Sequence, residues 1–94
     1  TPQRAIVDAG RKTLNAELAM PEVIDRPGVT FSRLSAEHGW LEVSPEAGPL
    51  RLGDRLHLVP GYSDFTTVLH DQFLAVRGGV VEDVWPLAAR GKLT

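Results

Sequence analysis

Apolar and polar residues alternate along several short stretches of the chain, a period of two that is typical of half-buried β-strands. Glycine and proline separate these stretches. A helix of one and a half turns is expected within 65–70, with Ser63 or Asp64 as its N-cap. The strand-like stretches are 4–8, 29–37, 40–43, 55–59, 72–77 and 80–85. This pattern predicts a mainly β fold, a small barrel-like domain of six to seven short strands with one short helix.

Two regions of the first half carry more specific expectations. The apolar run 4–8 predicts a strand that is buried on both faces at its centre. The alternation in 29–37 places Val29, Phe31 and Arg33 on one side of a strand and Leu34 on the other. His38-Gly39 then turns the chain into a return strand, which makes a hairpin.

The segments between these strands are expected to be irregular. Residues 11–19 fit either a helical turn or an irregular crossing segment, and 22–26, bracketed by prolines, fits a loop. Asp8 and Lys12 are interpreted as a solvated pair at a strand end.

Near the C-terminus, Gly78-Gly79 joins two apolar stretches, which is a strong hairpin signal. Val80, Val81, Val84 and Trp85 are expected to supply part of the core, and Pro86 to end the second strand.

Composition narrows the classes of function. Ninety-four residues make one domain. The net charge is −2 with both signs mixed along the chain, so no basic field favours nucleic acid or an anionic membrane. The chain has no cysteine, which excludes disulfides and thiolate zinc sites. No apolar run has membrane-spanning length and no signal peptide is visible, so a cytoplasmic location is the default expectation.

The stretch 59–71 concentrates most of the candidate chemistry. Pro60 ends a strand, and Tyr62, Ser63 and Asp64 then place a phenol, a hydroxyl and a carboxylate on successive positions. Thr66 adds another hydroxyl. The residues leave two roles open for Asp64, a helix N-cap or a site carboxylate, and two for Tyr62, a half-buried surface residue or a proton donor.

The histidines of the chain favour structural roles. His57 lies on the polar phase of a strand, which favours a surface or interface position. His70 next to Asp71 favours a structural pair, with a ligand role as the alternative. No Ser-His-Asp spacing argues for nucleophilic hydrolysis.

Several motifs, taken in order, resemble the C-terminal domain of the D-threonine aldolase and D-serine dehydratase family. That family carries Pro-x-His-x-Asp/Cys, then Thr and a Leu-His/Tyr-Asp run. No single motif is very specific, but their order and spacing together are, and they cover most of the chain. The matching segments are Pro60-Gly61-Tyr62-Ser63-Asp64, Thr66 to Asp71, Ile6 to Gly10 with Lys12, Glu37-His38-Gly39, Leu52-Gly53-Asp54-Arg55, and Val84-Trp85-Pro86 to Lys92.

The resemblance implies a pyridoxal-phosphate enzyme with an alanine-racemase-like barrel that binds the cofactor. Residues 1–94 would be its C-terminal β domain, with the N-terminal barrel upstream in the same polypeptide and with Asp8 to Lys12 near the seam between the two domains. A start at Thr1-Pro2 without Met is expected of a piece of a longer polypeptide, although processing could give the same start. The family's Schiff-base lysine is on the barrel, so no cofactor-binding residue is expected here, and the chain alone should be inactive. A homodimer is expected for the full-length protein.

The resemblance also suggests site residues. In the family, a His and an Asp or Cys two residues apart bind a divalent ion, and Asp64 matches the second ligand, with Mn²⁺, Mg²⁺ or Zn²⁺ as the candidate ions. Tyr62 stands where the family has His, and its phenol is a poor ligand that could act in proton transfer instead. Tyr62 is therefore the catalytic candidate, and Tyr62, Ser63, Asp64 and Thr66 are the substrate-binding candidates.

The expected reaction is retro-aldol cleavage of a D-3-hydroxy amino acid or β-elimination from D-serine. The alternative is a stand-alone small β-barrel that binds a protein or ligand without catalysis. A domain that normally packs against a barrel should expose a large apolar surface, which a self-sufficient module should not.

Overall fold

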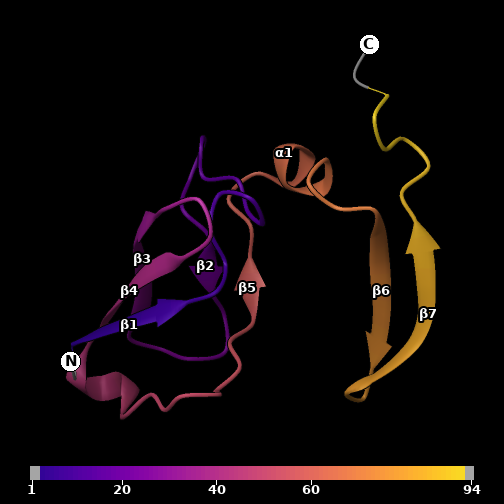
Figure 1. Ribbon diagram of the computed structural model, residues 1–94. Coiled ribbons are helices and arrows are strands. Elements are labelled where there is room, and N and C mark those ends of the chain that lie inside the picture. The colour runs from indigo at the N-terminus through magenta and orange to yellow at the C-terminus, as the bar shows by residue number, and fades with distance from the viewer. Residues whose placement is uncertain (1–2, 93–94) are drawn as a thin grey trace.

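The computed structural model describes residues 3–92, and these residues form seven strands and two short helical elements (Figure 1). The elements, in chain order, are β1 (Arg4–Val7), β2 (Glu22–Val23), β3 (Val29–Leu34), β4 (Gly39–Val43), the 3₁₀ turn η1 (Pro45–Ala47), β5 (Leu58–Val59), α1 (Ser63–Thr67), β6 (Gln72–Arg77) and β7 (Val80–Pro86). The mainly β prediction with one short helix is confirmed. The strands form three separate antiparallel sheets, and no closed barrel is present among residues 3–92.

The core lies on one face of the three-stranded sheet, in which β4 is flanked by β1 and β3. Val29, Leu41 and Val43 form its buried centre, and Leu41 is only 1 % exposed. Partly buried residues from β1, β2, β3 and the segments around η1 pack against this centre. The predicted hairpin 29–43 is confirmed.

Two details of this sheet differ from the sequence-based expectation. The run 4–8 is not buried on both faces, because β1 is an edge strand that pairs only with β4 and leaves Ile6 61 % exposed. A β-bulge between Phe31 and Arg33 shifts the register of β3, so Leu34 is buried like Val29 instead of facing the other side.

The expectation of a loop over 22–26 was also partly wrong. Glu22 and Val23 form β2, which pairs with β5 through Glu22 to Val59 and Val23 to Leu58. A two-residue strand has too little sequence to show an alternating pattern, and its partner lies more than thirty positions away in the chain. β5 is likewise shorter than the predicted stretch 55–59.

The hairpin of β6 and β7 projects from the rest of the domain (Figure 1). Its two strands pair with each other, and neither packs extensively against another element. Four residues of β7 were expected in the core but are 44 to 65 % exposed, namely Val80, Val81, Val84 and Trp85. The apolar residues of β6 are exposed to a similar degree, namely Phe73, Leu74 and Val76. The expectation was wrong because no layer formed by residues 3–92 covers the hairpin.

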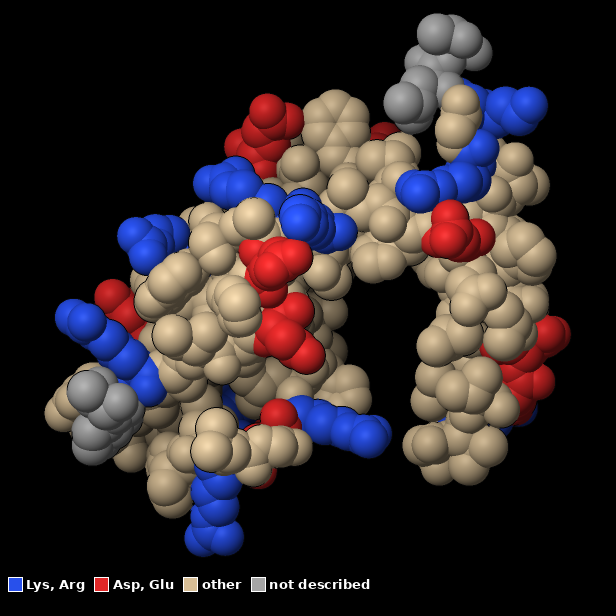
Figure 2. Space-filling view, viewed as in Figure 1, with Lys and Arg blue, Asp and Glu red and all other residues tan. Residues whose placement is uncertain are grey.

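The projecting hairpin gives the protein an unusually large surface. Its accessible surface is 7170 Å², whereas a compact monomer of 10.2 kDa exposes about 5,300 Å². The radius of gyration is 14.6 Å, against about 12 Å for a compact chain of this length. Charged side chains gather mainly on the body of the domain, and an open hollow separates the body from the hairpin below α1 (Figure 2). In residues 3–92, no helix is long and apolar enough to cross a membrane.

Candidate functional site

The candidate site residues lie on α1, which sits at the top of the hollow and joins the body to the hairpin (Figure 1). Tyr62, in extended conformation, is the N-cap of this helix, and no side chain makes a cap hydrogen bond. The predicted N-cap role of Ser63 or Asp64 is wrong, because the helix begins earlier than expected and both residues belong to its first turn. The carboxylate of Asp64 lies in the first turn, where the positive end of the helix dipole stabilises a negative charge.

The exposed end of α1 carries the phenol, hydroxyl and carboxylate that the sequence pointed to. Tyr62 is half-buried, and Ser63 and Asp64 are exposed. The ring of Tyr62 packs edge-on against Phe65 with centroids 4.8 Å apart, which fixes the ring plane and leaves Phe65 46 % exposed. Three of the four predicted substrate-binding residues, Tyr62, Ser63 and Asp64, therefore lie together at the surface.

Thr66, the fourth, has a different environment. Its side chain is 7 % exposed. Its hydroxyl donates to the carbonyl oxygen of Tyr62 at 2.7 Å and accepts from the backbone N–H of Asn15 at 3.1 Å. Both hydrogen-bonding directions of the hydroxyl are thus used within the domain. The substrate contact predicted for Thr66 stays a prediction.

Further contacts attach α1 and its flanks to neighbouring segments. The Nε2 atom of His70 lies 2.9 Å from the carbonyl oxygen of Thr13, so this nitrogen carries the proton and donates. The expected pairing of His70 with Asp71 is wrong, because Asp71 pairs with Arg90 at 3.0 Å. Arg90 also donates to the carbonyl of Val68, the C-cap residue of α1, where a cation is favourable.

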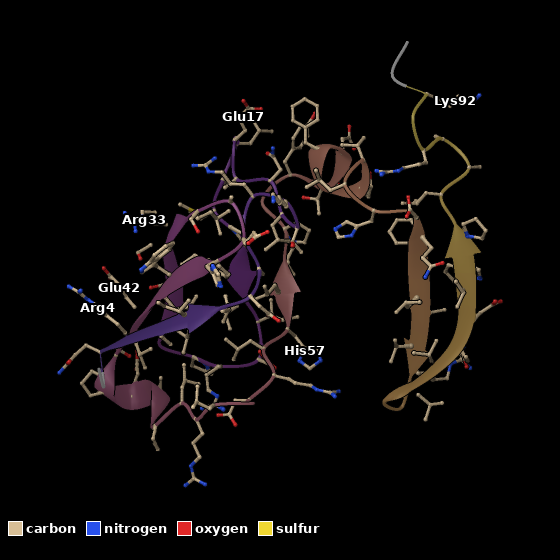
Figure 3. All side chains as sticks on the ribbon, viewed as in Figure 1. Arg4, Glu17, Arg33, Glu42, His57 and Lys92 are labelled. Carbon is tan, nitrogen blue, oxygen red and sulfur yellow. The ribbon has the colours of Figure 1, made fainter. Side chains whose placement is uncertain are left out.

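Two side-chain pairs that involve His57 and Lys12 lie away from α1. Nδ1 of His57 lies 2.6 Å from Asp25, and the backbone N–H of His57 donates to the same carboxylate at 3.0 Å. These hydrogen bonds lower the pKa of Asp25. Figure 3 shows His57 at the side of the body that faces the hollow, an exposed position that agrees with its expected surface role.

The second pair involves the lysine for which a surface role was expected. Lys12 pairs with Glu37 at 3.1 Å rather than with Asp8, and the hydrogen bond from Lys12 lowers the pKa of Glu37. Glu37 lies on the turn between β3 and β4, which the local spacing of Asp8 and Lys12 could not reveal. Both side chains of the pair are well exposed.

A complete metal or cofactor site does not fit the described residues alone. Within residues 3–92, no three His, Asp or Glu side chains cluster closely enough to hold a metal ion. Asp64 supplies one carboxylate, and the neighbouring phenol of Tyr62 is a poor ligand. Lys12 is engaged at the surface with Glu37, and Lys92 lies on the C-terminal tail (Figure 3). Other ligands of Asp64 would have to come from outside these residues.

The fold and site define a small β domain that presents a short, polar-tipped helix beside an uncovered apolar hairpin. Residues 1–76 match the family model described as "Putative serine dehydratase domain". The chain belongs to this family.

Named relatives extend the match over nearly the whole chain. It is 46 % identical to D-threonine aldolase from Arthrobacter sp over 90 residues, covering 96 % of this chain and 24 % of that protein. It is 44 % identical to 3-hydroxy-D-aspartate aldolase from Paracoccus denitrificans over 91 residues, covering 97 % and 23 %. The crystal structure of D-threonine aldolase from Filomicrobium marinum superposes with a TM-score of 0.91 at 41 % identity, covering all of this chain and 26 % of the other. The chain thus spans about a quarter of the length of these relatives.

Sequence reasoning missed the residues that hold the site in place. These residues contact α1 and the residues that follow it from distant parts of the chain. Asn15, Thr13 and Arg90 lie 51, 57 and 22 positions away from their partners. Gly61 packs directly against the backbone of Ala19. Gly61 was the one signal in the sequence that could have indicated the contact with Ala19, since a glycine allows another backbone segment to approach closely.

Proposed function

We propose that this chain is the C-terminal domain of a pyridoxal-phosphate-dependent enzyme that cleaves D-3-hydroxy amino acids or dehydrates D-serine. The chain would complete an active site whose cofactor is bound by an N-terminal barrel of the same polypeptide. The proposal draws on membership of the serine dehydratase domain family and on similarity to two aldolases of D-amino acids.

The observation that carries the proposal is the uncovered apolar surface of β6 and β7. An isolated two-stranded hairpin is marginally stable in water, and this one exposes Phe73, Leu74 and Trp85 at about half of their full surface. Phe65 on α1 and Val68 at its C-cap are exposed as well, at 46 % and 38 %. A surface of this kind is expected where another domain packs, and that domain would close over the polar end of α1.

Pyridoxal phosphate would act as an electron sink when bound by the barrel. The residues of this chain would then handle the 3-hydroxyl group of the substrate. The phenol of Tyr62 would donate a hydrogen bond or transfer a proton at that oxygen, and Ser63 and Asp64 would orient the substrate around it. The ring of Phe65 would keep the Tyr62 phenol in one orientation.

Four finer points remain part of the proposal. Asp64 would be one ligand of a divalent ion only if the barrel or a partner subunit supplied the others. A homodimer is proposed for the full-length protein, and Thr66 remains a candidate substrate contact. A cytoplasmic location is also proposed.

The test uses the full-length polypeptide that carries this domain. We expect a visible absorbance band from bound pyridoxal phosphate that changes on addition of D-threonine or D-serine, with release of an aldehyde or of ammonia. Tyr62→Phe should lower kcat about 10²- to 10⁴-fold, the range for a lost acid–base group, with the band unchanged. Asp64→Asn should abolish any stimulation by Mn²⁺.

The outcomes distinguish a domain of a pyridoxal-phosphate enzyme from a binding module without catalysis. Absence of a cofactor band and of activity toward D-amino acids would refute the enzyme and leave a binding module. Full activity of Tyr62→Phe would remove Tyr62 from the reaction.

A further inference from the structure

The position of the candidate site depends on very few contacts. No strand packs extensively against α1. The helix is five residues long, too short to hold its own conformation in water. Its placement must therefore come from the individual hydrogen bonds that join it to other segments.

Two hydrogen bonds, one from Thr66 in α1 and one from His70 just beyond it, lead to the same neighbouring segment. The hydroxyl of Thr66 accepts from the N–H of Asn15 at 3.1 Å, and Nε2 of His70 donates to the carbonyl of Thr13 at 2.9 Å. Both contacts are partly buried, so water competes for them less than at an open surface. Thr66 also binds the carbonyl of Tyr62, the residue that bears the phenol, at 2.7 Å.

The segment 13–15 is in turn fixed to the core of the domain. Arg11 donates its backbone N–H to Ser35 at 2.7 Å and Lys12 donates to Ala36 at 2.9 Å, both on the turn between β3 and β4. Leu14 is buried. Hydrogen bonds and the covalent backbone of residues 11–15 therefore link the turn between β3 and β4 to Thr66 and, through it, to the residue that caps α1.

We propose that Thr66 and His70 are positioning residues. Through their contacts with segment 13–15, they hold Tyr62 and Asp64 in a fixed position relative to the core of the domain. This inference rests on the proposed function for its catalytic consequence. In this role Thr66 acts through the backbone of Tyr62, and the role requires no contact of Thr66 with the substrate. A shift of about 1 Å in a catalytic group can reduce the rate about 10²-fold, so the contacts of Thr66 and His70 matter for kcat more than for binding.

The test compares hydroxyl variants of two neighbouring threonines in the full-length polypeptide. Thr66→Val keeps the shape of the side chain and removes both hydrogen bonds. Thr67→Val is the matched control, because among residues 3–92 the Thr67 hydroxyl bonds only to the carbonyl of Asp64 within α1. Thr66→Ser restores the hydroxyl, and His70→Ala removes the second contact.

We expect Thr66→Val to lower kcat about 10- to 100-fold, with KM changed by less than about twofold. Thr66→Ser should recover most of the loss, and Thr67→Val should not reproduce it. The double variant of Thr66→Val and His70→Ala should lose less than the product of the single losses, because the loss of either contact already releases the same segment. Amide hydrogen exchange should become faster in 11–17 and 61–71 in both single variants.

Three outcomes would overturn the inference. A raised KM with unchanged kcat in Thr66→Val would mean that Thr66 contacts the substrate. Unchanged amide exchange would mean that its hydrogen bonds do not hold the loop, and faster exchange with unchanged kcat would make them merely structural. If the wild-type polypeptide shows no cofactor band and no activity, the proposed function fails, and amide exchange alone still decides whether the loop is held.

Discussion

Gly61 offers the sharpest test of how the candidate site is placed. A Cβ atom at this position would lie 1.7 Å from the carbonyl oxygen of Ala19 and 2.5 Å from its carbonyl carbon. Real Cβ contacts below 3.0 Å essentially do not occur. The Gly61→Ala variant must therefore move Ala19 and residue 61 apart by about 1.3 Å, the difference between 3.0 Å and 1.7 Å. The obstacle is backbone, which cannot rotate away as a side chain could.

The cost of this substitution is steric rather than conformational. Gly61 is not among the glycines with positive φ, so its backbone conformation is open to alanine. Overpacking of this kind costs about 1–3 kcal/mol of folding free energy. Because Tyr62 follows directly, a shift above 1 Å should also reduce kcat of the full-length polypeptide by about 10²-fold.

Thermal unfolding and steady-state kinetics measure the two effects separately. Gly53→Ala is the matched control: the added Cβ meets no atom within 4 Å, but the residue has φ +90°. The Gly53→Ala variant should lose about 1–2 kcal/mol of folding free energy from left-handed backbone strain. It should keep the wild-type kcat, because Gly53 lies outside the stretch 59–71 that carries the candidate site. If Gly61→Ala kept both the wild-type unfolding temperature and the wild-type kcat, the close contact with Ala19 and the argument built on it would be refuted.

Two further predictions concern stability. Leu41→Ala should destabilise the domain by about 2–5 kcal/mol in denaturant unfolding, because Leu41 is 1 % exposed at the centre of the core; a loss below about 1 kcal/mol would mean that the core is not packed as described, and Leu41→Met should cost less than about 1.5 kcal/mol. The hydrogen bonds from His57 lower the pKa of Asp25, so this carboxylate stabilises the fold above its unfolded-state pKa and loses that contribution as the pH falls through its folded-state pKa. The stability difference between wild type and Asp25→Asn should therefore be largest near neutral pH and shrink below about pH 4, and a difference that is constant across thermal unfolding measured at several pH values would contradict the assignment.

The elements that were predicted well are those specified by neighbouring residues. Gly78-Gly79 between two apolar stretches fixes the hairpin of β6 and β7, and both glycines have the positive φ that a tight turn requires. Proline and glycine at 60 and 61 correctly mark the end of a strand before a polar turn. The site candidates Tyr62, Ser63 and Asp64 were found because they are consecutive and follow this break.

The details that were missed depend on distant partners. The bulge in β3 arises from pairing with β4, and the short strand β2 is defined by β5. The partners of Lys12 and His57 lie 25 and 32 positions away. The exposure of Val80 and Trp85 was missed for a related reason, since an apolar pattern shows that a surface is to be covered but not what covers it.

Local sequence was enough for the mainly β character, the two long hairpins and the cluster of polar groups around Tyr62. Motif order was enough for the family. Only the tertiary structure decided that Thr66 faces inward to Asn15, that Gly61 abuts Ala19, and that the hairpin stands uncovered. The physical reason is that turns and alternation are set by backbone preferences of adjacent residues, whereas these contacts form only when segments far apart in the chain come together.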